Sequence, residues 1–171
     1  MIPRLWLVAV ALLAACAPIP PSSTGDPSVA DLPAQPDFDA WWDYGDPAAT
    51  RARFVELEPA AAASGDADYH LQLLTQIART LGLEGQFDEA HARLDRVESE
   101  LDAATPVARL RYLLERGRAW RSAGQPERAR PLFEEAYRRG RETGADYHAV
   151  DAAHMVAITV DDTEDRRRWS L

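Results

Sequence analysis

The clearest structural signal in this chain is the stretch Gly85-Gln86-Phe87-Asp88-Glu89-Ala90-His91-Ala92-Arg93-Leu94. Apolar residues follow the glycine at positions 87, 90 and 94, and this spacing of three and four residues places them on one face of an α-helix. A glycine directly in front of such a pattern favours a turn. The stretch therefore predicts a tight turn followed by an amphipathic helix.

The same pattern returns 39 residues later, where Gly124-Gln125 precedes Ala129 and Phe133. A further echo lies at twice that distance, because Ala67-Asp68-Tyr69-His70 returns as Ala145-Asp146-Tyr147-His148. A fixed period of this size is typical of stacked supersecondary units. The sequence thus predicts an array of repeats.

Apolar residues at helical spacing also precede each turn. They are Leu71, Leu74, Ile77, Ala78 and Leu81 in the first unit, and Leu110, Leu113, Leu114, Gly117 and Trp120 in the second. Each unit therefore consists of two predicted amphipathic helices joined by a turn. Residues 149–157 begin a third unit, whose second helix would start near Asp162.

These units resemble the tetratricopeptide repeat. The family signature is a glycine, an aromatic residue two positions on, an alanine and a large apolar residue; it is matched by Gly85, Phe87, Ala90 and Leu94 and in part by Gly124, Ala129 and Phe133. Pro126 replaces the aromatic residue of the second unit, and the period exceeds the family's usual ~34 residues. The resemblance covers about residues 66–160 and implies an all-α fold, an α-solenoid of antiparallel helix pairs.

The chain contains one cysteine, Cys16, which closes Leu13-Ala14-Ala15-Cys16 after a short apolar run that follows Arg4. The run is too short for a spanning helix of ~20 residues and has the anatomy of a signal peptide. The motif resembles the lipobox of bacterial lipoproteins, which implies that the Cys16 thiol is acylated before cleavage on its N-terminal side. An ordinary secretory signal or a short buried helix is the alternative.

These features divide the chain into six predicted parts. They are a lipoprotein signal peptide (1–15), a lipidated N-terminus with a disordered Pro-rich tether (16–36), an N-terminal capping helix region (37–65), repeat 1 (66–104), repeat 2 (105–144) and a partial repeat 3 (145–171). Phe38, Trp41, Trp42 and Tyr44 are expected to cover the first end of the array. Repeat arrays normally finish with a polar capping helix, and Arg166-Arg167-Arg168 could form that polar finish. We expect instead either a truncated array or a partner that completes it.

Composition and motifs argue against catalysis. The formal net charge of −9 disfavours non-specific nucleic-acid binding. All 19 basic residues are arginine, so a Walker-type phosphate lysine, a Schiff base and a Ser-Lys dyad are excluded. His70 and His148 are equivalent positions of different repeats, which favours duplication over a metal site. We expect no enzyme activity, no cofactor and no metal.

The resemblance implies a groove along the first helices of the repeats. Its predicted residues are Gln72, Thr75 and Arg79 in repeat 1, Arg111, Leu114, Arg118 and Arg121 in repeat 2, and Val150, Ala153 and Ala157 in repeat 3. Arginines in such grooves clamp carboxylates of acidic peptide tails. The alternative is that Arg111 and Arg118 solvate a helix face or pair with Glu115.

The sequence therefore predicts a non-catalytic scaffold that binds a protein or an extended peptide, the latter with an acidic tail, and is held at the bacterial envelope by its lipid. Ala17 is not the aspartate that retains many lipoproteins in the inner membrane, so we expect the outer membrane, facing the periplasm, in a Gram-negative cell. Alternatives are an accessory domain or subunit of a cell-wall enzyme and a fragment of a longer repeat protein. A small-ligand pocket among Trp41, Trp42 and Tyr44 is a weaker third possibility.

Overall fold

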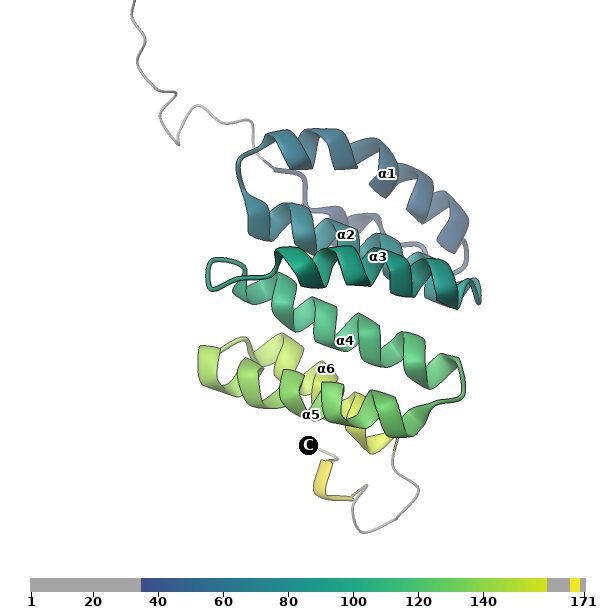
Figure 1. Ribbon diagram of the computed structural model, residues 1–171, viewed down its shortest axis with the longest axis vertical. Coiled ribbons are helices and arrows are strands. Elements are labelled where there is room, and N and C mark those ends of the chain that lie inside the picture. The colour runs from purple at the N-terminus through teal and green to yellow at the C-terminus, as the bar shows by residue number, and fades with distance from the viewer. Residues whose placement is uncertain (1–34, 160–166, 170–171) are drawn as a thin grey trace, which may run out of the picture. The chain divides into compact units, whose positions relative to one another are not determined.

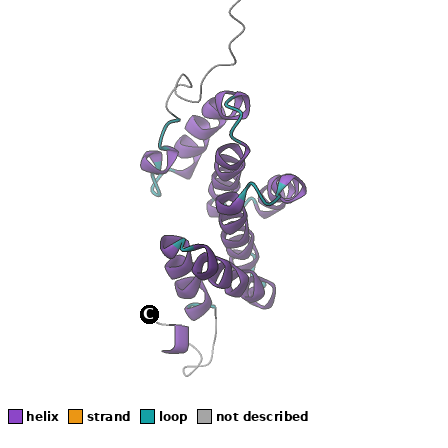
Figure 2. Ribbon diagram, turned by 90° about the vertical axis from the view of Figure 1, so that its left-hand side faces the viewer, coloured by secondary structure: helices purple, strands orange, loops and turns teal. Residues whose placement is uncertain are grey.

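The computed structural model describes residues 35–159 and 167–169, and these residues are helical without a strand (Figures 1 and 2). The elements are the 3-10 helix η2 (Phe38–Trp41) and the α-helices α1 (Pro47–Ala63), α2 (Ala67–Leu83), α3 (Phe87–Glu100), α4 (Pro106–Ser122), α5 (Pro126–Thr143) and α6 (Asp146–Ala157). The predicted all-α class is confirmed. Cys16, the predicted leader, most of the predicted tether and the segment near Asp162 lie outside the described residues.

Helix starts follow from short polar side chains and prolines. Asp46 accepts a hydrogen bond from the backbone N–H of Ala49 at 2.9 Å, and Asp66 accepts one from Tyr69 at 2.9 Å. Both carboxylates satisfy backbone donors that the first helical turn leaves without an intrahelical partner. Prolines begin α1, α4 and α5, where the missing N–H costs nothing.

Three helices end in the same way at Gly85, Gly124 and Gly144. These glycines have φ angles of 76°, 77° and 73°, in the left-handed region that side chains disfavour. The residue after each glycine donates its N–H to the carbonyl five residues back, at 2.9 Å in all three cases. This is the Schellman pattern, and it explains why the repeated sequence signal is centred on a glycine.

The predicted apolar stripes form the core. Leu71, Leu74, Ile77 and Ala78 of α2 are at most 2% exposed, and the other buried positions include Ala90, Leu94, Val97, Leu110, Leu113, Leu114, Ala129, Phe133 and Ala136. Burial of about 25 cal/mol per Å² of apolar surface is the main force that holds the helices together. Leu81, Phe87 and Trp120 are only partly buried.

Adjacent helices pack in a repeat-like manner. Helix α2 contacts α1, α3 and α4, whereas α4 contacts α5, and α5 contacts α6 (Figure 1). At Gly117 of α4, an added Cβ would lie 2.4 Å from the ring of Phe133, so the missing side chain allows α5 to approach closely. Helix α6 packs against α5 and makes few contacts with α4.

The N-terminal segment packs against α1 and α2 through Phe38, whereas Tyr44, which was also expected to cover the first end of the array, is 63% exposed. Phe38 is 4% exposed and its ring packs against Phe54 at 6.0 Å and Tyr69 at 5.2 Å between centroids. Near the C-terminus, the described residues 167–169 lie against α5, where Trp169 meets Tyr137 edge to face at 5.0 Å.

Candidate binding groove

A cleft of about 330 Å³ runs between the N-terminal segment, α2, α4 and α6. Its lining residues are Asp39, Trp42, Tyr44, Gln76, Arg79, Arg111, Leu114, Glu115, Arg118, Tyr147, His148 and Asp151. Three guanidinium groups and three carboxylates are among them, so the cleft carries no formal net charge when histidine is neutral.

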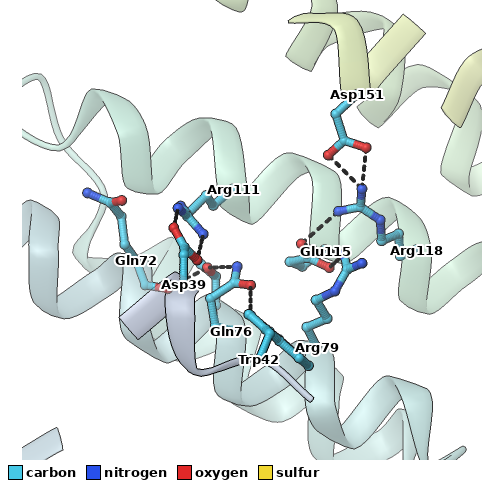
Figure 3. A network of polar contacts seen from close by, with 10 residues as sticks. Asp39, Trp42, Gln72, Gln76, Arg79, Arg111, Glu115, Arg118 and Asp151 are labelled. Carbon is cyan, nitrogen blue, oxygen red and sulfur yellow. Dashed lines mark hydrogen bonds and ion pairs between the residues drawn. The ribbon is translucent and has the colours of Figure 1, made fainter. Parts of the chain in front are cut away.

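Glu115 is the centre of an ion-pair network in this cleft (Figure 3). Arg79 of α2 donates to both of its carboxylate oxygens at 3.0 Å, and Arg118 donates to one of them at 2.7 Å. Arg118 also donates to both oxygens of Asp151 at 2.6 Å. The network thereby links α2, α4 and α6 across the groove.

Burial strengthens this network. The side chain of Glu115 is 5% exposed, and those of Arg79 and Arg118 are 19% exposed. Burial alone would lower the pKa of Arg118, but the carboxylates of Glu115 and Asp151 raise it above its ordinary value. Arg118 is therefore a permanent cation whose charge is compensated within the protein.

The third arginine is bound by the N-terminal segment. Arg111 donates two hydrogen bonds to Asp39, one of them 2.9 Å from Nη1 to Oδ1 and the other from Nη2 to Oδ2. The parallel pair is the geometry with which guanidinium groups recognise carboxylates. The groove therefore already holds one carboxylate at Arg111, and it comes from 72 residues earlier in the chain.

Two aromatic rings, Trp42 and Tyr44, lie beside Arg79. The rings of Trp42 and Tyr44 stack with their centroids 4.9 Å apart and their planes inclined by 9°. The guanidinium carbon of Arg79 is 5.6 Å from each centroid, within the range of cation–π attraction. The indole N–H of Trp42 donates to Oε1 of Gln76 at 3.2 Å.

The opposite wall is formed by α6. Tyr147 is 79% exposed there, whereas His148 is partly buried. Burial lowers the pKa of His148 below 6.5, and the nearby Arg111 lowers it further. His148 is therefore a neutral polar group of the cleft near neutral pH.

The groove continues toward the other ends of α2, α4 and α6 as a second cleft of about 200 Å³. Its walls include Leu83, Ala119, Met155 and Ile158, and it shares Arg79, Glu115 and Arg118 with the first cleft. Leu83 is 50% and Ile158 40% exposed. A polar half and an apolar half thus meet at the Glu115 network.

Residues of α4 and their counterparts one 39-residue period later differ in burial. Ala108, Glu115 and Ala119 of α4 are buried, yet their counterparts 39 residues later, Tyr147, His154 and Ile158, are exposed. Two of the α4 residues are alanines, whereas tyrosine and isoleucine hold the corresponding positions of the third unit, where α6 makes few contacts with α4. Tyr147 and Ile158 thus line the two clefts.

The predicted groove residues fall into three groups. Arg79, Arg111, Leu114 and Arg118 line the first cleft, with Leu114 buried at 2% exposure, and Arg121 lines the second. Gln72 lies beside the first cleft and donates to Asp68 at 2.9 Å. Thr75, Ala153 and Ala157 are a correction to the prediction, because all three are buried and line neither cleft, and the exposed Val150 lines neither cleft either.

Most of the groove's other polar and aromatic residues were not identified from the sequence. They are Asp39, Gln76, Tyr147, His148 and Asp151, whereas Trp42 and Tyr44 were named from the sequence only as part of a possible small-ligand pocket. Only Glu115 carried a local signal, since it lies three residues before Arg118 on one helix. The others meet through tertiary packing.

No group of three or more His, Cys, Asp or Glu side chains that could hold a metal ion occurs within residues 35–159 and 167–169. In that same part of the chain, no helix is both long and apolar enough to cross a membrane.

Comparison with known proteins gives no relative. No family model matches the chain, and no curated protein and no solved structure matches it.

Proposed function

We propose that this chain is a tetratricopeptide-like α-solenoid that binds a protein or an extended peptide in its groove, without catalysis. The observation that carries the proposal is the open groove bounded by α2, α4 and α6, in which polar and apolar halves are continuous. The two clefts adjoin each other along α2, α4 and α6, so together they are elongated. An elongated groove suits an extended chain segment better than a compact small molecule. The 39-residue period and the shared glycine helix ends support the repeat assignment.

The proposal includes an anchor at the bacterial envelope through a lipid on Cys16, supported by the sequence motif. A Cys16→Ser variant is expected to leave the membrane fraction, whereas the unaltered chain incorporates labelled fatty acid and sediments with membranes. Equal membrane association of both forms without lipid labelling would contradict the anchor.

The groove is tested by partner capture from the envelope. The full chain is chemically crosslinked in cells, and the attached proteins are identified by mass spectrometry. Tyr44→Ala and Tyr147→Ala remove exposed groove side chains, 63% and 79% exposed, so the fold should be kept. We expect one dominant partner that is captured at least about tenfold less by the combined variant.

The matched control is Val55→Ala, which removes another exposed apolar side chain, 45% exposed, from α1 outside the groove. Its capture of the partner should equal that of the unaltered chain. A partner that is retained by the groove variant but lost with Val55→Ala would contradict groove binding.

A further inference from the structure

Residues 35–44, here called the N-terminal strap, lie against the groove and contact both α2 and α4. Pro36 accepts a hydrogen bond from the Tyr69 hydroxyl at 2.8 Å, and Asp39 and Trp42 bind Arg111 and Gln76 as described above. The strap is helical only over the four residues of η2. Its side chains thus contact the groove as those of a short bound peptide would.

Besides the Tyr69–Pro36 hydrogen bond, two contacts fix the strap to the helices. Phe38 is the first, inserted between Phe54 and Tyr69 at 4% exposure. Asp43 is the second, because its N–H donates to Oγ1 of Thr50 at 3.0 Å and its carbonyl accepts from the same hydroxyl at 3.2 Å. Neither point lies on the residues that bind the groove.

Between these points, the groove contacts are made by the side chains of Asp39 and Trp42, and the Trp42 ring also packs edge to face against Phe54 with 5.4 Å between centroids. Asp39 is 45% exposed although its partner Arg111 is only 14% exposed. Water can solvate the exposed Asp39 carboxylate when it leaves, so the cost of opening the pair falls mainly on Arg111. Rotation of the Asp39 and Trp42 side chains would therefore free Arg111, Gln76 and the face of Arg79.

The groove side of these contacts is more constrained. Nε of Arg111 and Nε of Arg79 are buried without a hydrogen-bond partner. Both guanidinium groups thus depend on the partners at their terminal nitrogens, and for Arg111 that partner is the strap carboxylate. A ligand that replaces Asp39 must bring a carboxylate of its own, because leaving a buried cation unpaired is costly.

We infer that Asp39 and Trp42 occupy the positions of the partner's side chains, so that the partner is an extended peptide with a carboxylate for Arg111 and an aromatic ring for Gln76 and Arg79. Binding of the partner displaces these two strap side chains, and the strap weakens binding by competing for the groove. This inference rests on the proposed function and specifies the chemistry of its partner.

The test uses the full chain, purified in detergent, and a fluorescent synthetic peptide with the sequence of residues 35–44. The variant Asp39→Ala with Trp42→Ala removes the two strap side chains from the groove. We expect it to bind the peptide at least about tenfold more tightly than the unaltered chain, because the peptide no longer has to displace them. Adding Arg111→Ala to that variant should abolish the gain, as should alanine at the positions of Asp39 and Trp42 in the peptide.

The control is Trp41→Ala, which removes a tryptophan of the strap that does not line the cleft. This control should bind the peptide as weakly as the unaltered chain. Circular dichroism verifies the helical fold of each variant; if the first double variant unfolds, Asp39→Asn, which removes the charge and keeps the shape, replaces it with the same expected direction.

Equal peptide binding by the unaltered chain, the emptied variant and the control would overturn the inference, and so would no binding by a folded emptied variant. Either result leaves the proposed function to be judged separately by envelope capture. Groove-dependent capture without a strap effect would refute only the competition and the partner chemistry, whereas loss of groove-dependent capture would refute the proposed function itself.

Discussion

At the residue scale, Glu115 is the polar side chain on which the groove most depends. It is 5% exposed and accepts hydrogen bonds from two arginines, Arg79 and Arg118. Its desolvation is offset by these charge-assisted bonds, and the arginines in turn depend on it. Changing Glu115 should therefore alter stability as well as binding.

We expect Glu115→Gln to lower the free energy of unfolding by about 2–3 kcal/mol, because two largely buried guanidinium groups lose their charged partner while the side-chain shape is kept. Urea denaturation followed by circular dichroism measures this value. Glu142→Gln, which removes a carboxylate paired with Arg138 but 57% exposed, is the control and should cost less than about 0.5 kcal/mol. Equal losses for the two variants would show that the Glu115 network contributes no more than a surface pair.

Two histidines should make stability depend on pH. Burial lowers the pKa of both His91 and His148, so the unfolded chain, with a pKa of about 6.5, binds protons that the folded chain resists. Stability should be fully present above about pH 6.5 and fall as the pH is lowered toward the depressed folded values. Urea unfolding at several pH values measures how steeply the free energy of unfolding falls as the pH is lowered. This fall should be smaller for His91→Gln with His148→Gln than for the exposed His154→Gln. An unchanged fall in the double variant would contradict the prediction.

The residues that the sequence predicted well are those with local periodicity. Leu71, Leu74 and Ile77 repeat at helical spacing, and this pattern alone places them in the core. The Asp39–Arg111 pair joins residues 72 positions apart, and nothing in its local sequence indicates the pairing. Groove residues of this kind are fixed by how helices pack, which single-residue patterns do not contain.

At the element scale, small residues control how closely helices approach. Gly117 of α4 faces Phe133 of α5, and Gly140 of α5 faces Ala149 of α6, where an added Cβ would lie 3.0 Å away. The sequence pattern placed Gly117 on the apolar stripe of the second unit, and the structure places it against the ring of Phe133. The pattern did not predict that α6 makes few contacts with α4, although Tyr147 and Ile158 hold positions that are alanine one period earlier.

Gly117→Ala should lower the free energy of unfolding by about 1–3 kcal/mol, because the methyl group would overlap the fully buried ring of Phe133. Gly82→Ala is the matched control in helix α2, where an added Cβ meets nothing within 4 Å, and alanine there should be neutral or stabilising by up to about 1 kcal/mol. Thermal and urea unfolding measure both. A neutral Gly117→Ala would mean that α5 does not depend on this close contact.

At the scale of the whole molecule, helix pairs form the walls of one groove, and the N-terminal strap supplies part of its lining. The repeat period predicted the pairs and their order along the chain. It did not predict the strap, because residues 37–44 lie outside the repeats and carry no periodic signal. Function is therefore expected where the repeat pattern is broken, at the strap and at α6.

The most direct measurement of the central claim is site-specific photocrosslinking in the cell envelope, with a photoreactive amino acid placed at Tyr147 on the groove wall and, separately, at Val55 on α1. The proposal predicts one dominant crosslinked protein from position 147, reduced when excess peptide of residues 35–44 is present, and no such product from position 55. The same product from both positions, or a product from position 55 alone, would contradict the assignment of this groove as the binding site.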